Sequence, residues 1–216
     1  MYVSTRSGPQ ARPLAVLVHG MGRTPVSMAL LALRLRRAGF ATALFGYSVT
    51  FEKYSACLGR LQRFIDARAR PCVLIGHSLG GVLLRSVIPV LARPPAACFL
   101  LASPTRACVL ARRFAPTFAY RLVTGEMGRL LADEAFMRAV PVPSCPAWAY
   151  VGVSGPRSRF YPIGEEANDG ILKVSEAQLE GVPMVPVRAM HTFFMNSRPL
   201  VQDLVDKARA VLARTA

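Results

Sequence analysis

The stretch Cys72-Val-Leu-Ile-Gly-His-Ser-Leu-Gly-Gly81 is the clearest indicator of the fold of this chain. An apolar run passes into Gly-x-Ser-x-Gly, and an apolar segment with helical spacing follows at once. This order predicts a buried strand, a tight turn that exposes a serine, and a helix. Gly76 and Gly80 would let strand and helix approach closely, with Ser78 at the strained position of the turn. The pattern predicts a nucleophilic Ser78; the alternative is a serine that only caps a helix.

Similar apolar runs recur along the rest of the chain. They are nearly continuous rather than alternating, as expected for strands that are buried on both faces of a parallel sheet. The expected strands cover residues 14–19, 40–47, 72–76, 97–102, 147–153 and 184–188. Segments with helical spacing lie at residues 26–38, 54–70, 78–90 and 199–212. The alternation predicts an α/β fold, a doubly wound and mostly parallel sheet of about six strands with helices on both faces.

The length of 216 residues suits one domain over residues 1–216. Residues 104–145 are too many for a simple connection between two elements. Because residues 122–140 can form one or two amphipathic helices, we interpret 104–145 as an elaborated crossover or a lid. Residues 154–170 are rich in Gly, Pro, Arg and Asn, and we expect a loop there.

The chain is strongly basic, with 27 Lys and Arg against 12 Asp and Glu, a net charge of +15. Such a field attracts nucleic acid, anionic lipid or acidic substrates. The arginines are spread along the chain and no nucleic-acid-binding motif accompanies them, so we expect solvated surfaces and no nucleic-acid partner. An anionic membrane surface is a further candidate partner.

Five cysteines, an odd number without a Cys-x-x-Cys pair, argue against a disulfide framework and a zinc site. Cys72 and Cys98 fall in apolar runs, and we expect them to be buried. The N-terminus has no apolar stretch of signal-peptide length, and no uninterrupted apolar run reaches the ~20 residues that span a membrane. The expected location is therefore the cytoplasm.

The general base can be sought among only three histidines. His77 precedes Ser78 in the turn, where neighbouring side chains diverge, and His19 follows the first expected strand. His191 follows the last expected strand, as the base of a hydrolase triad does. The alternative for His191, which precedes Phe193 and Phe194, is a packing role.

The acid that orients the base lies between serine and histidine in hydrolase chain order. Asp169 stands in Asn-Asp-Gly within the expected loop, and its alternative is a turn residue. Glu165 and Glu166 are the reserve candidates. We interpret Asp133 as a surface charge in the middle of an amphipathic helix.

An oxyanion hole needs two N–H donors. One is expected from Leu79, after the serine, and the other from Met21 in His-Gly-Met-Gly, where glycines permit a tight path. An incomplete Gly-x-Gly also suggests a dinucleotide site, but Pro25 replaces its third glycine. Met21, Leu79, Met127, Phe193 and Phe194 are candidate walls of an acyl pocket or plain core residues.

The chain resembles the α/β-hydrolase family, in particular small bacterial lipase- and esterase-like enzymes without a large cap. The matching blocks are Leu-Val-His-Gly-Met-Gly-Arg-Thr, Ile-Gly-His-Ser-Leu-Gly-Gly, Asn-Asp-Gly-Ile-Leu-Lys-Val and Met-His-Thr-Phe-Phe-Met-Asn, which extend over nearly the whole chain. The resemblance implies a Ser78–Asp169–His191 triad, oxyanion donors at Met21 and Leu79, no cofactor and no metal. Residues 103–108 depart from the Gly-rich segment of many relatives.

These residues predict a serine hydrolase that cleaves small-molecule or lipid carboxylic esters through an acyl-enzyme. A thioesterase, acyltransferase or amidase would use the same triad. A third alternative is a basic, non-catalytic protein that binds anionic lipid or nucleic acid. Substrate choice and oligomeric state stay open at this point.

Overall fold

The structure, a computed structural model, describes residues 12–215, so the expectation about the N-terminus lies outside the described residues. Its centre is a six-stranded sheet in the order β2-β1-β3-β4-β5-β6, with every neighbouring pair parallel. The strands are β1 (Leu14–Val18), β2 (Ala41–Phe45), β3 (Cys72–His77), β4 (Ala97–Leu101), β5 (Ala147–Gly152) and β6 (Met184–Val187). The predicted doubly wound parallel sheet is confirmed.

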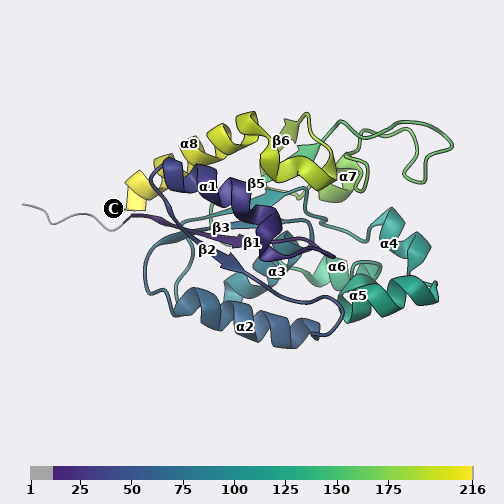
Figure 1. Cartoon of the computed structure of the whole chain (residues 1–216), viewed down its shortest axis with the longest axis horizontal. Coiled ribbons are helices and arrows are strands. Elements are labelled where there is room, and N and C mark those ends of the chain that lie inside the picture. The colour runs from purple at the N-terminus through teal and green to yellow at the C-terminus, as the bar shows by residue number, and fades with distance from the viewer. Residues whose placement is uncertain (1–11, 216) are drawn as a thin grey trace, which may run out of the picture.

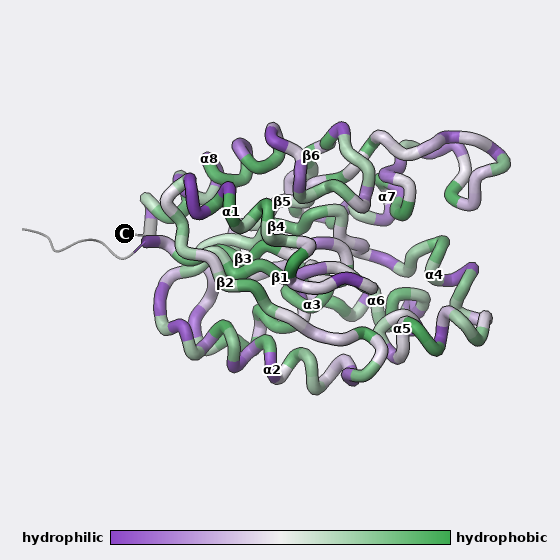
Figure 2. The backbone as a smooth tube through the Cα atoms, viewed as in Figure 1, coloured by the Kyte–Doolittle hydropathy of each residue, from purple (hydrophilic) through white to green (hydrophobic). Residues whose placement is uncertain are grey.

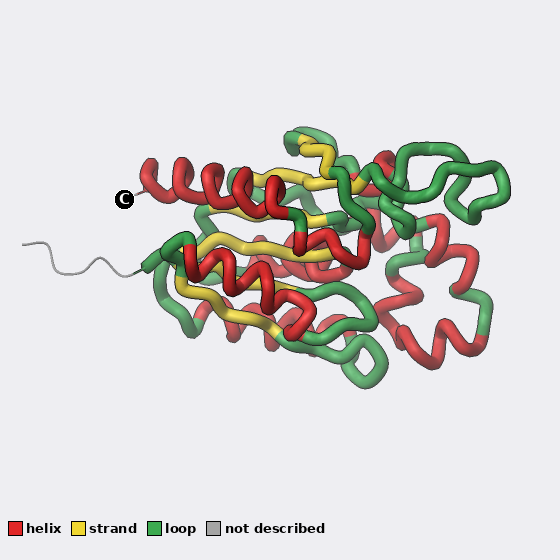
Figure 3. Tube along the Cα trace, turned by 45° about the horizontal axis from the view of Figure 1, so that its top comes forward, coloured by secondary structure: helices red, strands yellow, loops and turns green. Residues whose placement is uncertain are grey.

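Helices cover both faces of the sheet (Figures 1 and 3). The helices α1 (Ala29–Arg37) and α8 (Arg198–Thr215) pack on one face, and α2 (Tyr54–Asp66) and α3 (Leu79–Val87) pack on the other. Short 3-10 turns add η1 (Pro25–Met28), η2 (Ile88–Val90) and η3 (His191–Asn196). Within residues 12–215, no helix combines the length and the apolar character that crossing a lipid bilayer requires.

The interior strand β1, which pairs with β2 and β3, shows why these runs are apolar throughout. Leu14, Val16 and Val18 belong to the core beneath α2 and α3, whereas Ala15 and Leu17 belong to the core beneath α1 and α8. Alternate side chains of a strand point to opposite faces, and here both faces are covered. The apolar strands accordingly run through the middle of the molecule in Figure 2.

Two strands depart from the expectation of complete burial. β2 and β6 form the edges of the sheet, and most of their side chains are half-buried or exposed. Each of them has a hydrogen-bonded neighbour on one side only, and helices cover them incompletely. Pro186 fits this position because an edge strand tolerates a residue without an N–H donor.

The long segment after β4 forms three helices beyond the carboxyl ends of the strands, α4 (Val109–Phe114), α5 (Phe118–Leu130) and α6 (Glu134–Ala139) (Figure 1). Asp133 is exposed, as the sequence predicted, but the expectation that it lies in the middle of a helix is wrong. Asp133 is the N-cap of α6, and its carboxylate accepts a hydrogen bond of 2.9 Å from the Phe136 amide. That this segment acts as a lid stays a prediction.

Candidate active site

Ser78 lies in a strained turn between β3 and α3. Its φ of 52° and ψ of −123° place a non-glycine residue in a rarely populated region. The turn is held by two backbone hydrogen bonds of 2.9 Å, from the Ser78 amide to the Leu101 carbonyl and from the Gly81 amide to the Ser78 carbonyl. The half-buried side chain of Ser78 therefore stands at the carboxyl edge of the sheet.

The two glycines of Gly-x-Ser-x-Gly are required by close backbone approach. A Cβ at Gly76 would lie 2.5 Å from the Gly81 nitrogen. A Cβ at Gly80 would lie 2.3 Å from the Val18 carbonyl oxygen and 2.6 Å from that of His19. The Gly76 contact is the close approach of strand and helix that the sequence pattern predicted, and the Gly80 contact shows that the turn also lies against the end of β1.

His191 and Asp169 form a buried pair at the same edge. The Nδ1 atom of His191 lies 2.8 Å from Asp169 Oδ2, and the exposed fractions of the two residues are 8% and 2%. The backbone joins them as well, because the His191 amide donates to the Asp169 carbonyl at 2.9 Å. Because a carboxylate accepts hydrogen bonds, this contact favours the tautomer of the neutral imidazole that carries its proton on Nδ1 and has a free lone pair on Nε2.

The loop around Asp169 fixes the direction of its carboxylate. Asp169 Oδ1 accepts hydrogen bonds from the amides of Ile171 at 2.9 Å and Leu172 at 2.7 Å. Asn168 is fully buried, and its side chain donates to the carbonyls of Pro156 and Glu166 and accepts from the Gly170 amide. Asn168 is a supporting residue that the sequence analysis missed, although Asn-Asp-Gly contains it.

The reserve acids do not reach His191. Glu165 and Glu166 are both exposed. The Glu166 carboxylate instead accepts from the Ser175 amide at 3.0 Å and lies 3.8 Å from Lys173 Nζ. Of the three candidate acids, only Asp169 is brought against the imidazole.

His77 supports the loop that carries His191. Its buried ring lies 4.8 Å from the His191 ring, and its Nε2 lies 3.1 Å from the His191 carbonyl oxygen. A carbonyl only accepts, so Nε2 carries the proton. Burial, reinforced by repulsion from His191 and Arg23, lowers the pKa of His77 well below 6.5 and keeps the ring neutral. Its Nδ1 has no hydrogen-bond partner among the described residues.

The amides proposed for an oxyanion hole are both free to donate. Within residues 12–215, neither the Met21 nor the Leu79 N–H makes a hydrogen bond. The loop with Met21 lies against the serine, because a Cβ at Gly20 would come 3.0 Å from the Ser78 Cβ. His19 anchors this loop by stacking on Tyr47, with ring centroids 4.3 Å apart, and the Tyr47 hydroxyl donates to the His19 carbonyl at 2.9 Å.

The segment after β4, where the sequence departs from many relatives, is tied to the loop of Asp169. Thr105 donates from its amide to the Glu176 carbonyl at 2.7 Å and from its hydroxyl to the Gln178 carbonyl at 2.6 Å. The buried Glu176 carboxylate accepts from the amides of Val109 at 2.5 Å and Lys173 at 2.9 Å. Burial raises the pKa of Glu176. No local motif signalled this link, because its partners are far apart in the sequence.

The expected site residues thus meet at one edge of the sheet, although not every contact is formed. Ser78 Oγ makes no hydrogen bond with the side chains that the structure describes, His191 included. Among the candidate pocket walls, Met127 and Phe194 are fully buried in the core, whereas Phe193 is 63% exposed. The described residues contain no group of three His, Cys, Asp or Glu side chains placed to hold a metal ion.

Residues 15–215 match the model of the alpha/beta hydrolase family. No curated protein is similar enough to the chain to extend this comparison. Solved structures with the same fold include a Bacillus licheniformis lipase in its propeptide form, at 18% identity and a TM-score of 0.65 over 93% of this chain. The chain spans 51% of that propeptide form and 94% of the mature form.

Two further similar structures come from archaea. The monoacylglycerol lipase of Paleococcus ferrophilus has 16% identity and a TM-score of 0.61, covering 90% of this chain and 96% of the lipase. A structure reported with carboxylesterases of Nitrososphaera gargenis has 12% identity and a TM-score of 0.63, covering 97% and 94% of the two chains. At these identities the likeness concerns the fold.

Proposed function

Because the chain belongs to the alpha/beta hydrolase family, we propose that it hydrolyses carboxylic esters with Ser78, His191 and Asp169 as its catalytic residues. The observation that carries this proposal is the buried His191–Asp169 pair at the same sheet edge as the strained Ser78 turn. The pair leaves Nε2 of His191 available as a base, and the turn exposes the one hydroxyl that the family places there.

In the proposed reaction, His191 Nε2 removes the Ser78 hydroxyl proton while Ser78 Oγ bonds to the ester carbonyl carbon. The Met21 and Leu79 amides donate to the oxyanion of the tetrahedral intermediate. The imidazolium, held by Asp169, then protonates the leaving alcohol, and an acyl-enzyme remains. Water, activated by the same imidazole, releases the carboxylic acid and restores Ser78.

The rim of this edge favours an apolar acyl substrate. Four phenylalanines from segments that follow different strands are exposed, Phe51 by 92%, Phe118 by 79%, Phe160 by 83% and Phe193 by 63%. Exposed aromatic side chains at this edge offer apolar surface to a ligand or a lipid. Together with the net charge of +15, they support a lipid ester presented at an anionic surface.

The direct test uses p-nitrophenyl esters from acetate to palmitate and labelling by a fluorophosphonate. We expect Ser78→Ala to lose the label and at least about 10³-fold in kcat. Ser154→Ala is the matched control, because Ser154 is an exposed serine in the loop after β5 at the same edge. Wild-type protein that neither turns over any ester nor takes the label would contradict the proposal and favour the basic binding protein.

Substrate class can be resolved with the same variants. Oxygen esters, thioesters and amides with one acyl chain report which leaving group is preferred. Dispersing the preferred ester in anionic or zwitterionic vesicles tests whether the protein acts preferentially at an anionic membrane surface. We expect faster turnover on the anionic vesicles, and this advantage should decline as the salt concentration rises.

A further inference from the structure

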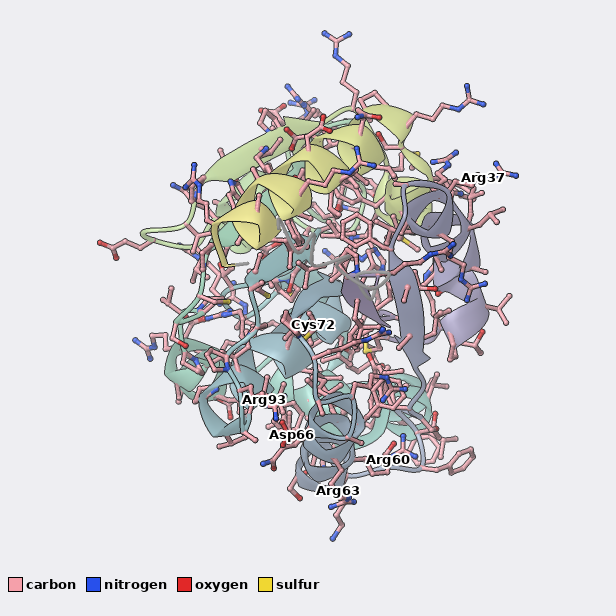
Figure 4. All side chains as sticks on the ribbon, turned by 90° about the vertical axis from the view of Figure 1, so that its left-hand side faces the viewer. Arg37, Arg60, Arg63, Asp66, Cys72 and Arg93 are labelled. Carbon is pink, nitrogen blue, oxygen red and sulfur yellow. The ribbon has the colours of Figure 1, made fainter. Side chains whose placement is uncertain are left out.

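A cavity of about 800 Å³ opens at the amino ends of the strands, at the edge opposite Ser78. It lies between the ends of α2 and α8 and the segments that lead into β3, β4 and β5. Figure 4 looks at this side of the molecule and shows Cys72, Asp66 and Arg93 close together on it. The volume lies within the range of small-molecule sites, which is about 300–1,000 Å³. Nothing in the proposed ester hydrolysis uses this cavity.

The walls of the cavity are mainly apolar and offer few hydrogen-bond donors. The lining includes Pro71, Pro95 and Pro146, none of which has a backbone N–H. Ile65 and Ala96 add aliphatic surface. Trp148, stacked on Phe99 with ring centroids 5.3 Å apart, forms one wall. A ligand with many polar groups would lose its hydrogen bonds with water here, whereas an aliphatic chain would not.

The rim of the cavity is positively charged. Arg70, Arg93, Lys207 and Arg214 line it, against a single carboxylate from Asp66. Lys207 forms an ion pair with Asp203. Among the described residues, none of the three arginines has an ion-pair partner. The rim therefore carries an unbalanced positive charge over an apolar interior.

We propose that this cavity binds a long-chain carboxylate, with its aliphatic chain against the proline- and Trp148-lined wall and its carboxylate at the arginines. A carboxylate matches the guanidinium groups in charge and in hydrogen-bonding geometry. A single aliphatic chain matches walls that lack donors. The site is distinct from the proposed active site and does not depend on ester hydrolysis.

Trp148 is the only tryptophan of the chain, which provides a direct assay. Bromine atoms quench an indole on contact, so 9,10-dibromostearate bound in the cavity will quench the emission of Trp148. We expect saturable quenching by the dibrominated carboxylate and at least about fivefold weaker binding of the corresponding dibrominated alcohol, which has no charge. Binding at the opposite edge of the sheet would leave the emission unchanged.

Charge reversal tests the rim. Arg214→Glu should weaken carboxylate binding about tenfold, because one attraction is replaced by a repulsion. Arg37→Glu is the matched control and should leave binding unchanged. Both are exposed arginines in the last turn of a helix without an ion-pair partner among the described residues, and Arg37 lies away from the cavity in Figure 4.

Three results would overturn the proposal: no quenching, equal binding of the alcohol, or equal weakening by the two reversals. If circular dichroism shows that Arg214→Glu is unfolded, the salt dependence of carboxylate binding to the wild-type protein serves as the test instead. An affinity that is independent of salt then contradicts the proposal. The proposed hydrolysis is tested separately through Ser78→Ala, so either conclusion can fail without the other.

Discussion

Replacing the carboxylate of Asp169 by an amide should disable the proposed site while preserving the fold. In Asp169→Asn, the side-chain oxygen can still accept from the Ile171 and Leu172 amides, which now lie 2.9 and 2.7 Å from Oδ1. The amide nitrogen would then face His191 Nδ1, where Oδ2 now lies at 2.8 Å. A donor at that point forces the proton of the imidazole onto Nε2, and the histidine can no longer act as the base.

The expected loss follows from the tautomer. Holding the wrong tautomer lowers kcat by about 10⁴-fold, which corresponds to about 5.4 kcal/mol at ~1.36 kcal/mol per tenfold. The fold should lose far less, because the two amides keep their acceptor. The assay is kcat on the best p-nitrophenyl ester at pH 8, with urea denaturation to compare the free energies of unfolding.

Glu166→Gln is the matched control, since it makes the same change of carboxyl to amide on an exposed reserve candidate. It should retain wild-type activity. The reasoning would be refuted if Asp169→Asn kept more than about a tenth of the wild-type kcat, or if Glu166→Gln lost as much.

Three further substitutions test the supports of the site. His77 has a folded-state pKa far below the ~6.5 of the unfolded chain, so below that pH the unfolded state binds more protons and stability is lost as the pH falls. His77→Gln should remove this loss of stability, which approaches about 1.4 kcal/mol per pH unit. Urea denaturation at pH values from 7 to 5 measures the free energy of unfolding of both proteins. If it falls with pH equally in the two proteins, His77 is not the cause. Gly80→Ala places a Cβ 2.3 Å from the Val18 carbonyl oxygen and should lower the free energy of unfolding by about 1–3 kcal/mol, whereas an unchanged urea midpoint would disprove the close approach. Tyr47→Phe removes the hydroxyl that donates to the His19 carbonyl at 2.9 Å and should cost about 1 kcal/mol in urea denaturation, with the stacked ring retained; a loss below ~0.3 kcal/mol would show that this hydrogen bond does not hold the loop.

Much of the fold could be predicted because its signals are local. Apolar runs of strand length, separated by segments with helical spacing, indicated all six strands and four of the main helices. The one or two amphipathic helices expected over residues 122–140 proved to be two, the end of α5 and the whole of α6, and α4 was missed because six residues give too little periodicity. The edge positions of β2 and β6 were also missed, since strand order depends on how the whole chain packs.

The sequence by itself determined the turn at Ser78, because Gly-x-Ser-x-Gly between an apolar strand and a helix meets a short-range steric requirement. It also reduced the acid to three neighbouring carboxylates. Only the tertiary structure decided that Asp169 faces His191 and that Glu166 faces Ser175, because a loop carboxylate takes its direction from amides and carbonyls brought to it by folding. The cavity beside Trp148 likewise lies where the ends of several elements come together in the fold, and no local sequence pattern predicts that they do.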